Sequence, residues 1–223
     1  MPDAAPVTRA VLPASVNMPE TLPILRRFGK RPILLENVRT RIPSCRGLWR
    51  CQVLGVAFRD KILTWDSLRT WRAQIRQAGE RLVVTNGCFD LLHIGHATYL
   101  EAARTLGDRL LVGVNSDASV RVLKGPSRPI YHEDDRAGLI AALGCVDAVC
   151  LFDEPSAERF LEWSKPDIWA KGGDYTLETV HPAERALVER TGGQIALVAW
   201  VPGRSSSAIL EQTRALTLTQ TVS

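Results

Sequence analysis

The chain is poor in the residues from which disulfide frameworks and structural metal sites are built. Its 223 residues hold only five cysteines and four histidines, and no two cysteines have the C-x-x-C spacing of a zinc site. No apolar run reaches the roughly 18 residues that a membrane-spanning helix requires, and the N-terminus lacks the apolar block of a secretion signal. We therefore expect a soluble cytoplasmic protein with reduced, mostly buried thiols and no membrane partner.

Acidic residues are scarce only at the front of the chain. Residues 1–60 contain 10 Lys or Arg and four Asp or Glu, a net charge of +6, whereas residues 61–223 contain 18 against 20, a net charge of −2. The overall charge of +4 thus belongs to the front segment and says little about the chemistry of the rest. We expect no nucleic-acid partner.

Proline is also concentrated at the front. Seven of the 13 prolines fall within residues 1–60, which show neither a helical nor a strand period. We predict an irregular or partly disordered basic extension over residues 1–60, a domain over residues 61–215 and a short tail over residues 216–223. A helix that opens at Trp65 and stops at Gly79 begins the domain.

Beyond this first helix, strand-like and helix-like blocks alternate along the chain. Such alternation is typical of a parallel sheet with helices on both faces. The fold class that we predict is α/β, a Rossmann-like doubly wound parallel sheet of about five strands. The predicted strands span residues 81–86, 109–115, 148–152, 168–170 and 194–200, and the helices span residues 97–106, 132–143, 156–163, 182–191 and 206–213, with a polar loop after Asn115.

The most informative stretch runs from Thr85 to His96, where an apolar strand enters a glycine turn and then a helix. His93 and His96 lie three residues apart at the predicted helix start, so they share one helix face. Free N–H groups at a helix start favour anions, and Gly95 permits a close approach to the backbone. The pattern predicts a nucleoside triphosphate site with both imidazoles directed at one phosphate.

Polar clusters follow other predicted strands, and the carboxyl ends of parallel strands share the edge where ligands bind. Asn115 ends the second strand, and Lys124 and Arg128 lie in the loop after it. A lysine beside a glycine in a loop can reach a triphosphate. Residues 171–175 follow the fourth strand, and residues 205–207 precede the last helix, where hydroxyl and N–H groups predict a second anion site.

Four segments of the chain carry a family resemblance: TNGCFDLLHIGH at 85–96, GDRLLVGVNSDASVRVLKGPSRPI at 107–130, RAGLIAALGCVDAV at 136–149 and PDIWAKGGDY at 166–175. With them, residues 84–209 resemble the cytidylyltransferase-like nucleotidyltransferase superfamily and, within it, the bacterial heptose 1-phosphate adenylyltransferases of ADP-heptose synthesis. The resemblance implies a Rossmann-like domain that couples a sugar 1-phosphate to a nucleoside triphosphate and releases pyrophosphate, with Mg²⁺. The usual substrates are ATP and D-glycero-β-D-manno-heptose 1-phosphate.

The resemblance also implies roles for single residues. The catalytic residues that we predict are His93, His96 and Lys124, and the substrate-binding residues are Asp90, Asn115 and Arg128. Asp90 either bonds a loop amide or holds a metal ion, so it is the one candidate protein ligand for a Mg²⁺ ion that ATP carries. The nucleotide-binding residues that we predict are Thr85, Asn86, Gly87, Phe89, Gly95, Lys171, Gly172, Asp174, Tyr175, Ser205, Ser206 and Ser207.

Two segments depart from the family pattern. Residues 179–183 read Thr-Val-His-Pro-Ala where the family typically has an Ile-x-Gly stretch, which leaves sugar selection open, and residues 205–207 read Ser-Ser-Ser instead of Ser-Thr-Thr. Many relatives are fused to a ribokinase-type sugar kinase domain, which residues 1–60 do not resemble. We therefore expect a separate sugar kinase to supply the substrate, and a homodimer is among the expected partners.

The mechanism that we expect is an in-line attack of the sugar phosphate on the α-phosphate, without a covalent intermediate. Adjacent phosphates would raise the pKa of His93 and His96, which would donate to the oxygens that gain charge. One alternative is a CTP-dependent cytidylyltransferase that acts on glycerol 3-phosphate or phosphoethanolamine. Another is a nucleotide-binding regulatory module without turnover. Class I aminoacyl-tRNA synthetases share His-Ile-Gly-His, but the chain has no Lys-Met-Ser-Lys-Ser loop.

Overall fold

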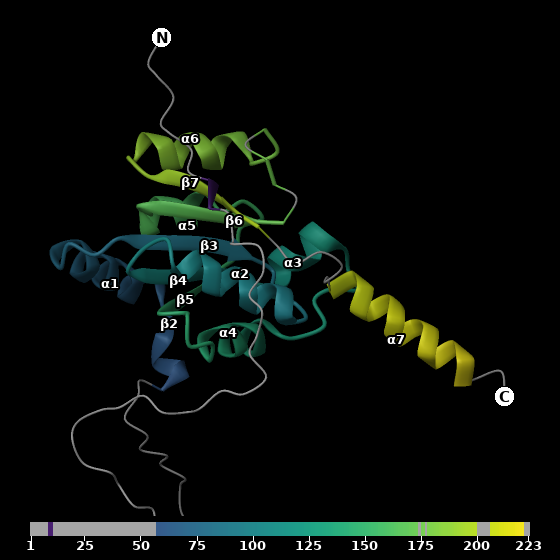
Figure 1. Cartoon of the computed structure of the whole chain (residues 1–223). Coiled ribbons are helices and arrows are strands. Elements are labelled where there is room, and N and C mark those ends of the chain that lie inside the picture. Colours follow the sequence, from purple (N-terminus) through teal and green to yellow (C-terminus); the bar gives the residue numbers. More distant parts are fainter. Residues whose placement is uncertain (1–8, 11–56, 174, 177, 200–205, 221–223) are drawn as a thin grey trace, which may run out of the picture. The chain divides into compact units, whose positions relative to one another are not determined.

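Figure 1 shows the computed structural model of the chain, which describes residues 9–10, 57–173, 175–176, 178–199 and 206–220. These residues belong to one of two compact units into which the chain divides, namely residues 1–12 together with residues 56–223. The other unit, residues 13–55, lies outside the described residues, and so does most of the predicted extension. The domain boundaries at residues 61 and 215 therefore stay predictions.

Within the described residues, seven strands form one sheet in which every neighbouring pair is parallel. The order across the sheet is β1-β7-β6-β3-β4-β5-β2. The strands are β1 (Arg9–Ala10), β2 (Ile62–Leu63), β3 (Leu82–Gly87), β4 (Arg109–Asn115), β5 (Ala148–Phe152), β6 (Ile168–Gly172) and β7 (Gln194–Val198). The doubly wound parallel sheet predicted from the sequence is confirmed. Its five predicted strands are β3 to β7, and β1 and β2 are short additions at the two edges.

The central strands are apolar on both sides because helices cover both faces of the sheet. In β4, every residue from Leu110 to Asn115 is buried, and in β3 the buried run extends from Leu82 to Thr85. A strand buried on both faces reads as a continuous apolar run instead of an alternating one. This explains why both strands could be recognised from the sequence.

The helices follow the alternation expected for this sheet, with two differences from the prediction. They are the 3₁₀ helix η1 (Phe58–Lys61) and α1 (Trp65–Gln77), α2 (Ile94–Arg104), α3 (Asp117–Lys124), α4 (Glu133–Ala141), α5 (Glu158–Ser164), α6 (Pro182–Arg190) and α7 (Ser206–Gln220). α7 continues beyond the predicted end at residue 213. α3 occupies the segment that we expected to be a polar loop.

The helix α3 is stabilised by a polar cap at its start and by a small buried side with one polar and one apolar residue. The Ser116 hydroxyl caps it by accepting a hydrogen bond from the main-chain N–H of Ser119, at 3.3 Å. Only Ser119 and Val120 of this helix are buried. An inner side with one apolar residue gives no clear helical period, so the sequence pattern indicated a loop. Lys124 therefore ends a helix and does not lie within a loop.

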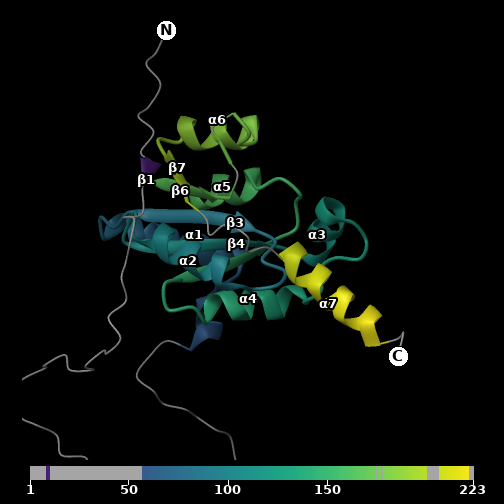
Figure 2. The same cartoon turned by 45° about the vertical axis from the view of Figure 1, so that its right-hand side comes forward.

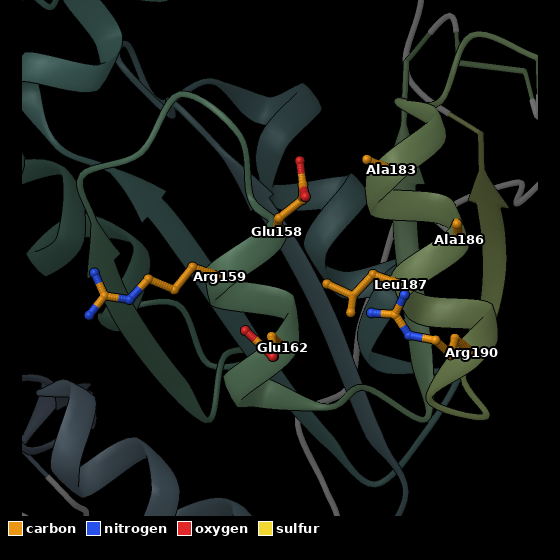
Figure 3. A pocket seen from close by; sticks show the side chains of 7 residues that line it. All are labelled: Glu158, Arg159, Glu162, Ala183, Ala186, Leu187 and Arg190. Carbon is orange, nitrogen blue, oxygen red and sulfur yellow. The ribbon is translucent and has the colours of Figure 1, made fainter.

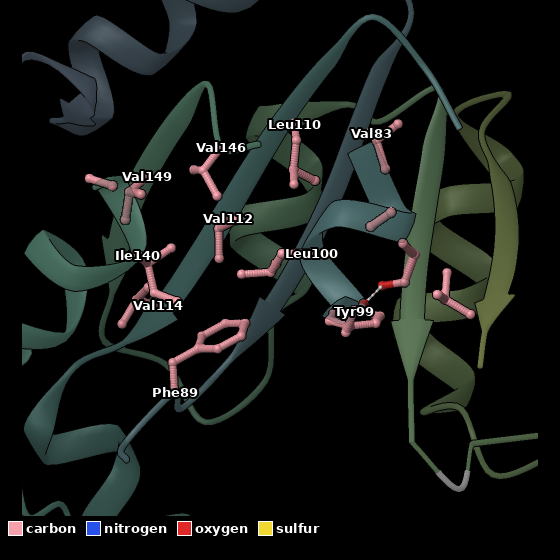
Figure 4. Packing of buried hydrophobic residues seen from close by; sticks show 14 of the residues in the cluster. Val83, Phe89, Tyr99, Leu100, Leu110, Val112, Val114, Ile140, Val146 and Val149 are labelled. Carbon is pink, nitrogen blue, oxygen red and sulfur yellow. Dashed lines mark hydrogen bonds between the residues drawn. The ribbon is translucent and has the colours of Figure 1, made fainter. Parts of the chain in front are cut away.

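Two apolar clusters hold the helices on the two faces of the sheet. One cluster joins the strands to Tyr99, Leu100 and Ala103 of α2 and to Ile140 of α4, and Figure 4 shows its side chains. The other lies on the opposite face, where α1, α5 and α6 pack. Its largest member is Trp169 of β6, which is fully buried. None of the described helices has both the length and the apolar character needed to cross a bilayer.

Candidate active site

The turn between β3 and α2 brings the two motif histidines to a helix start, as predicted. β3 ends at Gly87, α2 begins at Ile94, and His93 is the residue that caps the helix. The Phe89 backbone adopts a positive φ of 46°, and its ring packs in the core with 7% exposure. The Phe89 ring thus packs in the core and lies edge-on to the ring of His96, with 5.3 Å between the ring centroids, and its role in nucleotide binding stays a prediction.

The rings of His93 and His96 are stacked, with their centroids 3.9 Å apart. The main-chain N–H of His93 donates to Nδ1 of His96 across 3.4 Å. When Nδ1 accepts a hydrogen bond, a neutral imidazole carries its proton on Nε2. We infer from this contact that neutral His96 has a donor at Nε2, which is the atom opposite its anchored side.

The electrostatic surroundings of His96 favour the neutral ring. Burial, and secondly the charge of His93, lower the pKa of His96 to about 4. We expected phosphates to raise this pKa, and the protein's own groups act in the opposite direction. An anion beside the ring would therefore have to overcome both burial and the neighbouring histidine before His96 becomes a cation.

Asp90 anchors the loop that precedes α4. Its Oδ1 accepts hydrogen bonds from the main-chain N–H groups of Ile130, at 2.6 Å, and Tyr131, at 3.1 Å. Its other oxygen pairs with Arg128, and Asp90 is only 3% exposed. Of the two alternatives for Asp90, the structure has the bond to loop amides. Asp90 and Arg128 thus tie the loop to the turn, and their roles in substrate binding stay predictions.

Arg136 of α4 is a site residue that the sequence analysis missed. It is fully buried and donates to the carbonyl oxygen of Cys88 at 2.6 Å, to that of Tyr131 at 3.0 Å, and to Oδ1 of Asp117 at 2.8 Å. One guanidinium therefore joins the motif turn, the loop before α4 and the first turn of α3. The sequence did carry one signal for this role: Arg136 lies four residues before Ile140, which places it on the buried face of α4.

Thr85 of β3 and Gly172 of β6 both contact the side chain of Tyr99 in α2. The Tyr99 hydroxyl donates to the carbonyl oxygen of Ala170 at 2.9 Å, so the Thr85 hydroxyl donates to Tyr99 across their 2.7 Å contact. Thr85 is 1% exposed and its hydroxyl is bonded to Tyr99, and its role in nucleotide binding stays a prediction. Gly172 lies against the same ring, because a Cβ at this position would be 2.5 Å from two of its carbons.

Asn86 and Lys171 meet on the other face of the sheet. Oδ1 of Asn86 accepts hydrogen bonds from Nε1 of Trp169, at 3.0 Å, and from Nζ of Lys171, at 3.4 Å. Nζ also lies 3.9 Å from Oε2 of Glu184 and near the rings of Trp169 and Tyr175. Burial lowers the pKa of Lys171, while Glu184 opposes this effect. Lys171, which we predicted to bind the nucleotide, thus helps to orient the Asn86 side chain of the motif.

Of the other predicted residues, some contact the turn directly and others contact its neighbouring elements. Oγ of Ser206 donates to the carbonyl oxygen of Leu91 at 3.2 Å, which joins the start of α7 to the turn. Figures 1 and 2 show α3 and the start of α7 at the same end of the sheet. Asn115 is buried, and its Nδ2 donates to Ser119 at 2.9 Å. Lys124 is exposed at the end of α3.

Of the remaining predicted residues, one is exposed, one is buried and two lie outside the described residues. Ser207 is exposed and Gly95 is buried at the start of α2. Asp174 and Ser205 lie outside the described residues. Burial raises the pKa of the Cys88 thiol in the turn, and Lys124 is the first of the charges that oppose this shift. The charge of Lys124 therefore reaches the turn even though its side chain projects from a helix end.

Two grooves in the described part of the chain lie elsewhere, between helices on the opposite side from α2. One, of about 440 Å³, runs between α5 and α6 and is shown in Figure 3. Its lining residues are Glu158, Arg159, Glu162, Ala183, Ala186, Leu187 and Arg190. None of the predicted site residues lines either groove, so the candidate site lies apart from both.

Comparison with known proteins gives concordant matches over the same part of the chain. A sequence model of the cytidylyltransferase-like family matches residues 84–211. The bifunctional protein HldE of Methylobacillus flagellatus is 54% identical over 153 residues, which are 69% of this chain and 31% of that protein. HldE of Syntrophotalea carbinolica is 50% identical over 158 residues, 71% of this chain and 32% of that protein.

The chain spans about a third of the length of these relatives. Among solved structures, a lipopolysaccharide core biosynthesis protein from Thermoplasma volcanium is 32% identical and covers 55% of this chain and 98% of its own, with a TM-score of 0.46.

Proposed function

The chain belongs to the cytidylyltransferase-like family, and on that premise we propose that it is a nucleotidyltransferase that transfers AMP from ATP to a sugar 1-phosphate and releases pyrophosphate. We propose D-glycero-β-D-manno-heptose 1-phosphate as the sugar substrate, which makes ADP-heptose the product. The choice of sugar is supported by the segments TNGCFDLLHIGH and PDIWAKGGDY and by the 50–54% identity to HldE proteins. A separate sugar kinase would supply the substrate.

The observation that carries the proposal is the stacked histidine pair at the start of α2. A helix start offers main-chain N–H groups to an anion, and His96 adds a donor at Nε2 because its Nδ1 is already bonded. In an in-line displacement, the α-phosphate oxygens and the leaving pyrophosphate gain charge. Donors that are fixed in advance toward those oxygens stabilise the transition state without reorganisation.

The surrounding residues support this arrangement by fixing the turn. Arg136 bonds the Cys88 carbonyl from one side, and Asn86 is held from below by Trp169 and Lys171. We propose that Lys124 neutralises the triphosphate and that the start of α7, at Ser206 and Ser207, contacts its leaving part. No step needs a covalent bond to the protein, so the task of these residues is to position and to neutralise.

The described residues do not fit a Mg²⁺ ion held by the protein. No three His, Cys, Asp or Glu side chains among them come together as a metal site. The Asp90 carboxylate already accepts two main-chain hydrogen bonds and pairs with Arg128. We therefore propose that Mg²⁺ comes to the site on the phosphates of ATP, as is usual for this ion.

A pyrophosphate-release assay tests the proposal. The full chain is offered each of four nucleoside triphosphates with a panel of sugar 1-phosphates, glycerol 3-phosphate and phosphoethanolamine. We expect release with ATP and the heptose 1-phosphate, and its loss in His96→Ala. Release only with CTP and glycerol 3-phosphate or phosphoethanolamine would replace the proposed substrates. Nucleotide binding without release for any acceptor would indicate a regulatory module.

A further inference from the structure

A second groove, which we name the basic groove, runs between α1 and α5 and has a volume of about 690 Å³. It runs from Arg69 to the end of α1 and along the last turn of α5, and these helices lead into the amino ends of β3 and β6. In a parallel sheet this is the end opposite the carboxyl edge that holds the histidines. Its lining residues are Arg69, Arg72, Ala73, Arg76, Gln77, Glu162, Trp163 and Lys165.

The lining of the basic groove carries four cationic side chains and a single carboxylate, that of Glu162. Arg69, Arg72 and Arg76 are three and four residues apart on α1, so they share one face of the helix. The dipole of a helix favours cations only within its last turn. It accounts for Arg76 but not for Arg69 or Arg72, which lie earlier.

Arg72 is the buried centre of the groove, with 5% exposure. Its Nε donates to the carbonyl oxygens of Ser164, at 3.0 Å, and Lys165, at 3.1 Å, and its Nη2 donates to Lys165 O at 2.9 Å and to Oδ2 of Asp167 at 3.1 Å. Nη1 has no hydrogen-bond partner among the described residues. Buried donors are nearly always bonded, so this one, in a residue that lines the groove, points to an acceptor that does not belong to the described residues.

The charges around Arg72 lead to the same conclusion. Burial lowers the pKa of its guanidinium, Asp167 opposes this, and the charge of Arg76 lowers it further. The charges of Arg72 and Arg76 thus repel each other, and the Asp167 carboxylate partly offsets this repulsion. The guanidinium of Arg69 lies 5.2 Å from the ring centre of Trp163, which holds it beside the groove. An anion would relieve this repulsion.

We propose that the basic groove is a second anion site, separate from the catalytic edge, that binds an oligophosphate. A chain of phosphates fits better than a single phosphate, since Arg69 and Arg76 are separated by seven residues, or about 10 Å along the helix axis. Guanidinium groups suit phosphate oxygens because their donors are arranged as a fork. The inference is independent of the proposed reaction, because none of its residues belongs to the candidate active site.

Nuclear magnetic resonance of the full chain tests the proposal, with sodium tripolyphosphate as the probe and orthophosphate at equal ionic strength for comparison. We expect tripolyphosphate to shift the indole N–H signal of Trp163 and the Nε–H signal of Arg72. Orthophosphate should shift them only at much higher concentration. Tripolyphosphate shifts confined to residues 85–96, or equal affinity for the two anions, would overturn the proposal.

A double variant, Arg69→Gln with Arg76→Gln, removes two cations while it leaves the bonds of Arg72 to the main chain. We expect tripolyphosphate to bind the groove roughly tenfold more weakly or worse in this variant, given the usual strength of hydrogen bonds between charged groups. The matched control is Arg59→Gln with Arg190→Gln, two exposed arginines outside the groove, one of which lies in the last turn of α6. Equal losses in both double variants would show general charge attraction and would overturn the site.

An inactive chain that still binds tripolyphosphate in the groove would support this inference even where the proposed reaction fails. Conversely, an active chain whose Trp163 and Arg72 signals do not respond would overturn the groove and leave the proposed reaction intact. The two proposals therefore fail separately.

Discussion

At the scale of single residues, His96 combines a partly buried ring with an anchored Nδ1, and these two features decide how it can act. As a neutral ring it can still donate from Nε2, so catalysis by donation does not require a cation. The sequence predicted the helix start and the shared face of the histidines because both depend on local spacing. It could not predict the direction of the pKa shift, since burial is supplied by residues distant in the chain.

Contacts with residues distant in the chain also decide what the other motif residues do. Thr85 and Asn86 are neighbours in β3, and successive residues of a strand face opposite sides of a sheet. Thr85 bonds Tyr99 on the α2 side, whereas Asn86 bonds Trp169 on the side of α5 and α6. The motif pattern indicated a ligand site as a whole, and it could not separate side chains that face a ligand from those that hold the turn.

We predict that His96 titrates near pH 4 in the chain without nucleotide and at a higher pH once ATP is bound. The folded chain binds this proton less readily than the unfolded chain, whose histidine has the ordinary pKa of 6.5. As the pH falls from about 6.5 toward 4, protonation of His96 therefore favours unfolding. Histidine ring signals followed by nuclear magnetic resonance provide the measurement. In His93→Ala the pKa of His96 should rise, and a value at or above 6.5 in the unliganded parent chain would contradict the prediction.

We predict that His96→Ala binds ATP almost normally but loses turnover by about 100-fold or more, the usual effect of removing one fixed donor to a developing charge. Calorimetric titration measures binding, and pyrophosphate release measures kcat. His132→Ala is the matched control, because the His132 side chain is 89% exposed at the start of α4. A near-normal kcat in His96→Ala would remove this histidine from the catalytic residues.

At the scale of elements, the site depends on contacts between segments that are far apart in the chain. Arg136 of α4 joins the turn at Cys88 to α3 at Asp117, and Ser206 of α7 bonds Leu91. No local pattern predicts such contacts, which is why Arg136 was missed. α3 was wrongly interpreted as a loop for a related reason, since its buried side is made of Ser119 and Val120 and depends on a cap from Ser116.

The packing of β6 against α2 gives a prediction for Gly172→Ala. The added Cβ would lie 2.5 Å from ring carbons of Tyr99, whose hydroxyl is fixed by Thr85 and Ala170. We expect the free energy of unfolding to fall by about 1–3 kcal/mol, as for other overpacked cores. Denaturant unfolding is the measurement, and Gly144→Ala, where a Cβ would meet nothing within 4 Å, is the control. Equal stability of the two variants would show that Tyr99 can move aside.

At the scale of the whole molecule, alternation of apolar strands and amphipathic helices was enough to predict the parallel sheet. The two edge strands could not be predicted, because each has only two residues and forms through pairing with β7 or β5. The basic groove was also invisible in the sequence. Its cations come from α1 and from the end of α5, which only the sheet brings together.

Truncation tests how much of the chain the fold needs. We predict that residues 57–223 remain folded and active, whereas residues 66–223 lose at least about 2 kcal/mol of stability, since hydrogen bonds of charged groups contribute about 1.5–3 kcal/mol. The longer fragment keeps β2 paired with β5 and keeps Lys61, whose Nζ donates to the carbonyl oxygens of Val146, at 2.8 Å, and Leu143, at 3.3 Å. Denaturant unfolding and pyrophosphate release, measured on both fragments and on the full chain, check this. Equal stability of the two fragments would show that β2 and Lys61 are dispensable, and an inactive but folded 57–223 fragment would show that residues 1–56 contribute to the reaction.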